Sequence, residues 1–120
     1  LGADGDPPAP PTNFSVSDTA STYGPYFTAY SKVTLSWTAP TLTSEGDALT
    51  DLLGYKIQWR DSPTAEWKEL LVNNSALTTY VFDQEVNLQQ GQTYYFRLYA
   101  YDSGNQDSTA ATATHATAFK

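Results

Sequence analysis

Histidine and cysteine, which often serve as the base or the nucleophile of an active site, are nearly absent from this 120-residue chain. His115 is its single histidine, so any Ser–His–acid triad would need this residue. It lies in a Thr- and Ala-rich stretch, and no Gly-x-Ser-x-Gly motif occurs anywhere in the sequence. The chain also lacks cysteine, so it has neither a thiol nucleophile nor a Cys-ligated zinc site. We therefore expect His115 to be a surface residue on a strand, and we predict no catalytic residues.

Acidic side chains are a second source of chemistry, because two carboxyl groups that face one sugar can hydrolyse a glycosidic bond. Such pairs lie roughly 5 to 9 Å apart across a cleft. No pattern in the sequence predicts that cleft, and acidic residues are mostly exposed in folded proteins. We interpret the following loop carboxylates as solvated charges: Glu45, Asp47, Asp51, Glu66 and Glu69.

The segment Asp102-Ser-Gly-Asn-Gln-Asp107 concentrates oxygen ligands of the kind that calcium prefers. Its order does not match an EF-hand loop, which needs Gly at the sixth position and Glu at the twelfth. Asp, Asn and Gly are also the ordinary residues of turns. We therefore predict a hairpin loop here, with no metal site and no cofactor.

Aromatic side chains offer a different kind of site, one for binding. Four of them lie in one short segment: Tyr23, Tyr26, Phe27 and Tyr30. They either form a platform for a sugar ring or a protein partner, or fold back to cover one end of the domain. A second group shares the outer face of one predicted strand, where it serves either recognition or cross-strand packing: Tyr95, Arg97, Tyr99 and Tyr101. We take both groups as candidate ligand contacts.

Strands must position these residues, and the alternation of apolar and polar residues predicts where the strands lie. The clearest one runs from Tyr94 to Tyr101, where every second side chain is apolar or aromatic and faces one way. No window has the 3.6-residue period of an amphipathic helix. Further candidate strands lie at 13–16, 33–37, 55–60, 67–70, 79–82 and 109–119. Seven strands divided by Gly, Pro, Asn and Asp turns predict an all-β chain, folded as a seven-stranded antiparallel β-sandwich.

Charge and composition exclude several partners. The formal net charge is −7 and only six residues are Lys or Arg, so we expect no basic patch for nucleic acid or for an anionic membrane. No apolar run approaches the roughly 20 residues that span a bilayer, so we predict no membrane insertion. Residues 1–10 are rich in proline and predict a semi-rigid linker, which leaves 11–120 as the domain. We expect the chain to be a piece of a longer protein.

Several landmarks follow one another in a characteristic order: Trp37 before Pro40, Gly54-Tyr55 at the start of an alternating strand, and Leu88-x-x-Gly91-x-x-Tyr94-x-Phe96. In this order the chain resembles a fibronectin type III domain, an immunoglobulin-like sandwich. The resemblance implies that Tyr94 is a buried corner tyrosine whose hydroxyl bonds a nearby backbone group. Two departures from the family are an enlarged first loop, Ser17 to Lys32, and a small insertion, Asp83 to Val86.

The resemblance implies no conserved catalytic residue and no obligatory ligand, so it indicates the fold far better than the function. We expect the chain not to be an enzyme. It would be a non-catalytic spacer, adhesion or protein-interaction module of a larger extracellular or cell-surface protein. Its partner would be a protein or a glycan, besides the other domains of the parent chain. The alternative is a carbohydrate-binding module in which the loop aromatics stack on sugar rings.

Overall fold

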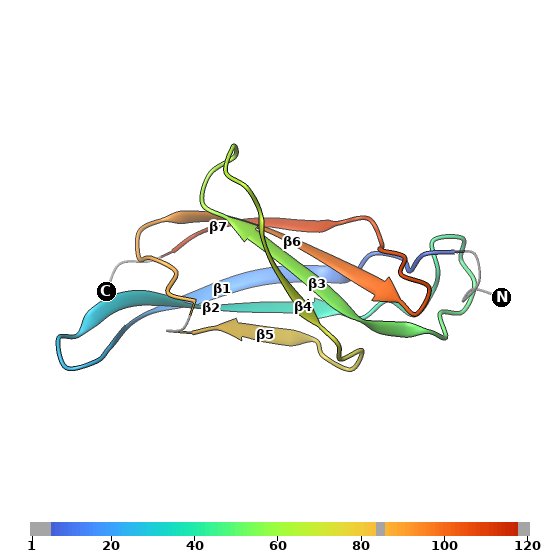
Figure 1. The fold of residues 1–120 in the computed structure, drawn as a ribbon, viewed down its shortest axis with the longest axis horizontal. Coiled ribbons are helices and arrows are strands. Elements are labelled where there is room, and N and C mark those ends of the chain that lie inside the picture. The colour runs from blue at the N-terminus through green and yellow to red at the C-terminus, as the bar shows by residue number, and fades with distance from the viewer. Residues whose placement is uncertain (1–5, 84–85, 118–120) are drawn as a thin grey trace.

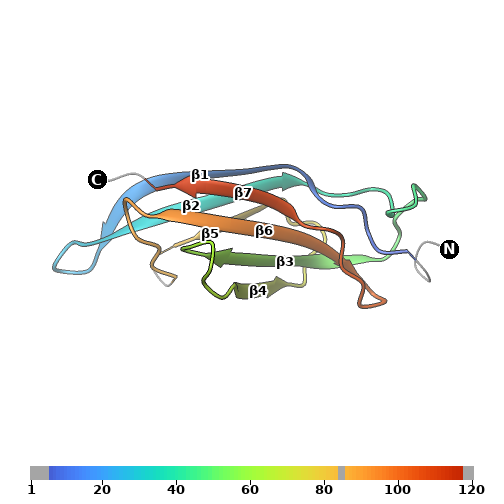
Figure 2. The ribbon, with the colours of Figure 1, turned by 90° about the horizontal axis from the view of Figure 1, so that it is seen from above.

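The computed structural model describes residues 6–83 and 86–117, which form seven β-strands and no helix. One antiparallel sheet has the order β1-β2-β5 and consists of β1 (Thr12–Tyr23), β2 (Thr28–Thr38) and β5 (Thr79–Phe82). The other has the order β4-β3-β6-β7 and consists of β3 (Leu52–Arg60), β4 (Lys68–Val72), β6 (Thr93–Asp102) and β7 (Ala111–Ala116). The two sheets lie against each other (Figures 1 and 2), which confirms the predicted seven-stranded antiparallel sandwich.

The core lies between the sheets and is largely aromatic. Alternate residues of β2, β3 and β6 are buried, because successive side chains of a strand face opposite ways. Trp37 of one sheet contacts Tyr55 of the other, with ring centroids 5.0 Å apart, and Trp59 contacts Phe82 at 4.8 Å. Ring-to-ring packing therefore joins the two sheets, in a chain that has no cysteine to cross-link them.

The first connection is a long hairpin, so the prediction of an enlarged first loop from Ser17 to Lys32 is wrong. β1 and β2 pair from Ser15↔Ser36 to Tyr23↔Thr28, and only the turn at 24–27 remains between them. The stretch consists largely of Ser, Thr and Ala, in which backbone pairing forms a ribbon without a strong apolar alternation. Figures 1 and 2 show this hairpin projecting at the end of the molecule opposite the β6–β7 loop.

Tyr94 is the buried corner residue that the sequence predicts. The backbone N–H of Gln89 donates a 2.7 Å hydrogen bond to its hydroxyl oxygen. This bond spans the turn that leads from Leu88 into β6. The hydroxyl therefore fixes the point at which the strand begins, and the predicted bond to a backbone group is confirmed.

The segment before β1 lies against the domain from Pro7 onward. The N–H of Ser44 donates to the carbonyl of Pro7 at 2.9 Å, and the N–H of Ala9 donates to the carbonyl of Leu42 at 3.0 Å. Pro8, between them, is fully buried. Residues 1–5 of the predicted linker, 84–85 of the predicted insertion and 118–120 of the predicted domain lie outside the described residues.

Candidate functional site

His115 lies on β7 and contacts Asp18 of β1, with its Nε2 atom 2.5 Å from the Oδ1 atom of the carboxylate. The Ser31 hydroxyl donates to the other oxygen of Asp18 at 3.1 Å. Serine thus bonds the carboxylate rather than the imidazole, which is not the order that activates a nucleophile. The contact joins the outer strands of the two sheets instead. The sequence did not predict it, because Asp18 fell within the supposed first loop.

Two of the acidic side chains singled out in the sequence, Asp51 and Glu69, lie in different parts of the fold and have different partners. The Ser103 hydroxyl donates to Asp51 at 3.1 Å, and the Gln58 amide donates to Glu69 at 2.8 Å. Glu45 and Asp47 lie in a loop whose backbone N–H groups donate to the hydroxyl of Thr43. Across residues 6–83 and 86–117, no three His, Asp or Glu side chains gather as a metal site would require.

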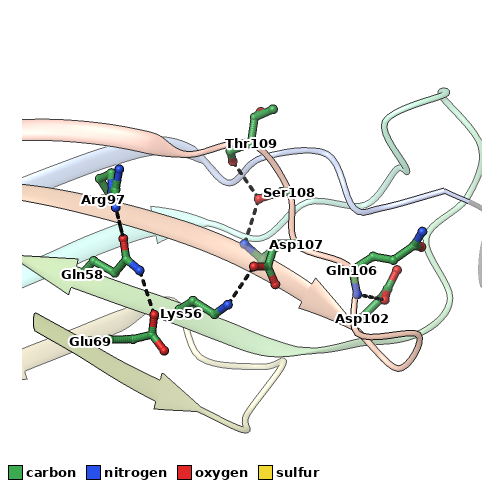
Figure 3. Close-up of polar contacts among 10 residues, drawn as sticks. Lys56, Gln58, Glu69, Arg97, Asp102, Gln106, Asp107, Ser108 and Thr109 are labelled. Carbon is green, nitrogen blue, oxygen red and sulfur yellow. Dashed lines mark hydrogen bonds and ion pairs between the residues drawn. The ribbon is translucent and has the colours of Figure 1, made fainter. Parts of the chain in front are cut away.

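Asp102 is fully buried, and its carboxylate closes the β6–β7 loop. The Oδ1 atom accepts hydrogen bonds from the backbone N–H groups of Gly104 at 2.9 Å and Gln106 at 3.0 Å. Figure 3 shows the second of these bonds inside the loop. The carboxylate therefore organises a turn, as the turn-forming residues in this segment predicted.

The four aromatic residues from Tyr23 to Tyr30 do not form one platform. Tyr26 is 90% exposed and Phe27 is 76% exposed in the turn at 24–27, which we call the hairpin tip. Tyr30 is only 5% exposed, and its hydroxyl donates to Asp83 at 2.7 Å. The half-buried ring of Tyr23 packs edge-on against Tyr30, with centroids 5.5 Å apart. Tyr30 therefore does not share the exposed surface of the tip, because its ring belongs to the base of the hairpin.

Contacts from the turn before β6 hold the base of the hairpin. The Gln90 amide donates to the carbonyls of both Ser21 and Tyr30 at 3.0 Å, one on each strand. The N–H of Ser31 donates to the carbonyl of Leu88 at 2.6 Å. The tip beyond this point is closed by the N–H of Phe27, which donates to the carbonyl of Gly24 at 3.2 Å. A fixed base thus carries a tip whose two aromatic rings are largely exposed.

The second predicted group lies on the outer face of the four-stranded sheet, with one correction. Tyr95, Arg97 and Tyr99 are half-buried there, but Tyr101 is only 7% exposed. Tyr101 pairs with Asp107 in an isolated bridge, so the β6–β7 loop lies beside it. The alternation along β6 correctly predicts that the Tyr101 side chain points outward, but the β6–β7 loop that follows the strand covers its ring. Tyr101 is therefore buried on this face, unlike the half-buried Tyr95 and Tyr99.

Trp67 joins this outer face, although the sequence did not single it out. The guanidinium carbons of Arg97 and Arg60 lie 4.0 Å and 4.1 Å from the centre of its ring, close enough for cation–π attraction. Arg97 also donates from Nε and Nη2 to the Gln58 oxygen, and the Gln58 amide donates to Glu69, in the row that Figure 3 shows. The signal in the sequence was an aromatic residue at the start of a short edge strand.

A pocket of about 350 Å³ lies further along the same face, next to the β6–β7 loop. Its lining residues are Lys56, Glu69, Leu71, Tyr101, Asn105 and Asp107. Lys56 and Asp107 form an ion pair at 2.7 Å across it, and the hydrogen bond to Asp107 raises the pKa of Lys56 above its usual range. Burial raises the pKa of the Tyr101 hydroxyl above its usual range.

Comparisons with known proteins identify the family. A family model described as Fibronectin type III domain matches residues 9–115. The chicken CNTN1 FN1–FN3 domains share 17% identity at a TM-score of 0.66, over 93% of this chain and 31% of that one. The third fibronectin III domain of human KIAA0343 protein shares 18% identity at a TM-score of 0.65, and the match covers 100% of this chain and 91% of that one. The FN5 domain of Drosophila Lar shares 15% identity at a TM-score of 0.62, and the match covers 94% of this chain and 99% of that one. At these identities the structural likeness extends to the fold alone.

Proposed function

The chain belongs to the fibronectin type III family, and on this basis we propose that it is a non-catalytic protein-interaction module whose contact point is the hairpin tip. Domains of this family are generally non-catalytic and are common in adhesion and receptor proteins. Such proteins act at the cell surface or outside the cell, and we assign this chain to the same location. No helix among the described residues is long and apolar enough to cross a bilayer.

The exposure of Tyr26 and Phe27, 90% and 76%, carries the proposal. Scattered exposed apolar residues are normal, but two adjacent aromatic rings at the end of a projecting ribbon are not scattered. Aromatic side chains give large contact area at low entropic cost, which is why they dominate binding hot spots. Nothing in the rest of the described fold contacts these two rings closely enough to bury them.

The backbone of the tip supports the same proposal. Phe27 has a φ of 53° and lies in the left-handed region, which is uncommon for a bulky residue. Such a conformation costs on the order of 1–3 kcal/mol and persists mainly where the surroundings or a function require it. Here the strained residue presents its ring to solvent. A partner that buries the ring would offset that cost.

The chemistry of the tip defines the kind of partner. The segment Gly24-Pro-Tyr-Phe27 carries no charged side chain, although the chain as a whole has a net charge of −7. The contact is therefore apolar, and we expect a protein partner with an apolar pocket. Because no ion pair takes part, the affinity should change little between low and moderate salt.

The experiment starts by replacing Phe27 with a photo-crosslinking phenylalanine analogue and identifying the protein captured from the surface of the source cells. The affinity of that purified protein is then measured for the unmodified domain and for the double variant Tyr26→Ser/Phe27→Ser. We expect a loss of binding in the variant and an unchanged melting temperature, because neither ring is packed. Tyr30 is left intact, since its ring and hydroxyl hold the hairpin base.

A matched control replaces two exposed apolar residues elsewhere, Leu53→Ser/Val81→Ser, and should bind normally. A partner whose affinity survives the tip variant would overturn the proposal. A glycan array probed with the same proteins tests the alternative. Glycan binding that depends on Tyr26 and Phe27, with no protein captured, would make the chain a carbohydrate-binding module that uses these aromatics.

A further inference from the structure

The pocket beside the β6–β7 loop is distant from the hairpin tip, which lies at the other end of the molecule (Figure 1). Its volume of about 350 Å³ is at the small end of the range for ligand sites, roughly 300–1,000 Å³. The lining comes from three places in the sequence: β3 with Lys56, β4 with Glu69 and Leu71, and the end of β6 with its loop. The pocket is therefore formed by several elements of the fold and does not lie within a single turn.

One polar group of the pocket, the carboxylate of Glu69, is held in place before any ligand arrives. Glu69 accepts a 2.8 Å hydrogen bond from the Gln58 amide, whereas Lys56 and Asp107 form a 2.7 Å ion pair at the partly exposed side of the pocket (Figure 3). Gln58 is in turn fixed by two hydrogen bonds from Arg97. Polar groups that are already oriented lose little entropy when they bind a ligand.

Tyr101 provides an independent observation that points to a ligand. It is only 7% exposed, and its buried hydroxyl has no hydrogen-bond partner among the described residues. Buried polar groups in folded proteins almost always have a partner, so an unpaired one requires an explanation. The Lys56–Asp107 pair beside it is partly exposed, with side-chain exposures of 24% and 40%, and so has room to move aside. A ligand hydroxyl would then complete the missing bond.

The charges of the pocket decide the class of ligand. An anion would face the carboxylates of Glu69 and Asp107 in a chain of net charge −7. A cation would face Lys56 and would compete with it for Asp107. A neutral ligand rich in hydroxyl groups avoids both costs, since it can donate to the carboxylates and accept from the ammonium group.

We propose that this pocket binds a neutral saccharide residue. The hydroxyl groups of the sugar bond Glu69, Asp107 and Tyr101. Its apolar C–H face lies against Leu71, which is 52% exposed at the edge of the pocket. The Asn105 amide can both donate and accept, so it adapts to either orientation of a ring hydroxyl. This site is separate from the hairpin tip and does not depend on it.

The test is an NMR titration of the ¹⁵N-labelled full chain with D-glucose, D-galactose, D-mannose and N-acetyl-D-glucosamine, each up to tens of millimolar. We expect saturable shifts from at least one sugar at the amides of Leu71, Asn105 and Asp107, and none at Tyr26 or Phe27. Glu69→Gln should weaken that binding by roughly tenfold, because it replaces a charged acceptor with a neutral one. Glu66→Gln, outside the pocket, should not.

Tyr101→Phe separates a ligand contact from a structural role. We expect weaker sugar binding and a melting temperature that is unchanged or higher, because the hydroxyl has no partner in the free protein. Sodium acetate and guanidinium chloride serve as charged probes, and shifts caused only by either one would overturn the saccharide assignment. The absence of saturable shifts with all four sugars would overturn it as well. Tyr26→Ser/Phe27→Ser should leave the sugar response intact, which keeps this test distinct from that of the proposed function.

Discussion

Tyr94 and Tyr101 are both buried on β6, yet their hydroxyl groups have different surroundings. The hydroxyl of Tyr94 accepts a 2.7 Å hydrogen bond from the N–H of Gln89, whereas that of Tyr101 has no partner among the described residues. We expect Tyr94→Phe to lower the free energy of unfolding by about 1–3 kcal/mol, because the N–H of Gln89 loses its partner. Thermal denaturation measures this effect, with Tyr99→Phe on the outer face as the control. Equal melting temperatures for the two variants would contradict the role given to the corner.

For single residues, the sequence predicted the direction of a side chain better than whether another segment covers that side chain. The alternation along β6 correctly predicted that Tyr94 points inward and that Tyr95 and Tyr99 point outward. It could not predict that Tyr101 is covered, because the β6–β7 loop that lies beside it is set by tertiary contacts. Tyr30 was uncertain for the same reason, since its partner Asp83 is 53 positions away. The contacts of Trp67 could not be predicted, because its partners Arg60 and Arg97 lie on other strands.

Among the elements, the β1–β2 hairpin differs most from the prediction. Its outer part has few apolar residues, so periodicity gave no strand there. The pairing of Ser21 with Tyr30 and of Tyr23 with Thr28 nevertheless continues the ladder almost to the turn. This pairing is stabilised in part by a residue outside the hairpin, Gln90, whose amide donates a hydrogen bond to each of the two strands. The alternation of apolar and polar residues within the hairpin cannot predict a hydrogen bond from a residue so distant in the sequence.

The edge strand β4 depends on a glycine in β3. A Cβ atom on Gly54 would clash with the carbonyl oxygen of Val72 and approach the backbone nitrogen of Asn74 to 3.0 Å. Backbone atoms cannot turn aside as a flexible side chain can, so we expect Gly54→Ala to push β4 away and to cost roughly 1–3 kcal/mol. Chemical denaturation measures the loss. Gly46→Asn is the control, since a Cβ there meets nothing within 4 Å and Asn tolerates the positive φ. A Gly54→Ala variant as stable as this control would contradict the close approach of the two strands.

For the whole molecule, burial makes stability sensitive to alkaline pH. Burial raises the pKa of Tyr55, Tyr94 and Tyr101, and the hydrogen bond to Asp107 raises that of Lys56. Each group keeps its proton longer in the folded chain than in the unfolded one, so their contribution is complete below about pH 10 and is lost as the pH rises further. We expect the melting temperature to fall steadily above that pH. Tyr101→Phe should fall less steeply, and a melting temperature independent of pH in this range would contradict the burial of these tyrosines.

The overall architecture was largely predictable, because it rests on short-range patterns repeated seven times. The alternation of Val33, Leu35 and Trp37, and of Tyr55, Ile57 and Trp59, predicted two inward faces, and these faces meet in the core. The corner at Tyr94 and the glycine before Tyr55 identified the family of sandwiches. The pocket was not predictable, because Lys56, Leu71 and Asp107 are brought together by two strand pairings and a loop.

β1 begins toward one end of the long axis and β7 stops toward the other, and the molecule extends 55 Å along this axis (Figures 1 and 2). β1 and β7, the strands next to these ends, run along that axis and are paired with β2 and β6 over most of their length. A force that pulls the two ends apart would therefore load many backbone hydrogen bonds at once, in shear, instead of peeling them apart one by one. The domain should behave as a stiff mechanical link. Pulling from its two ends in an optical trap should give a much higher rupture force than pulling from Thr12 and Thr38, the paired residues at the open end of the hairpin, a geometry that unzips β1 from β2.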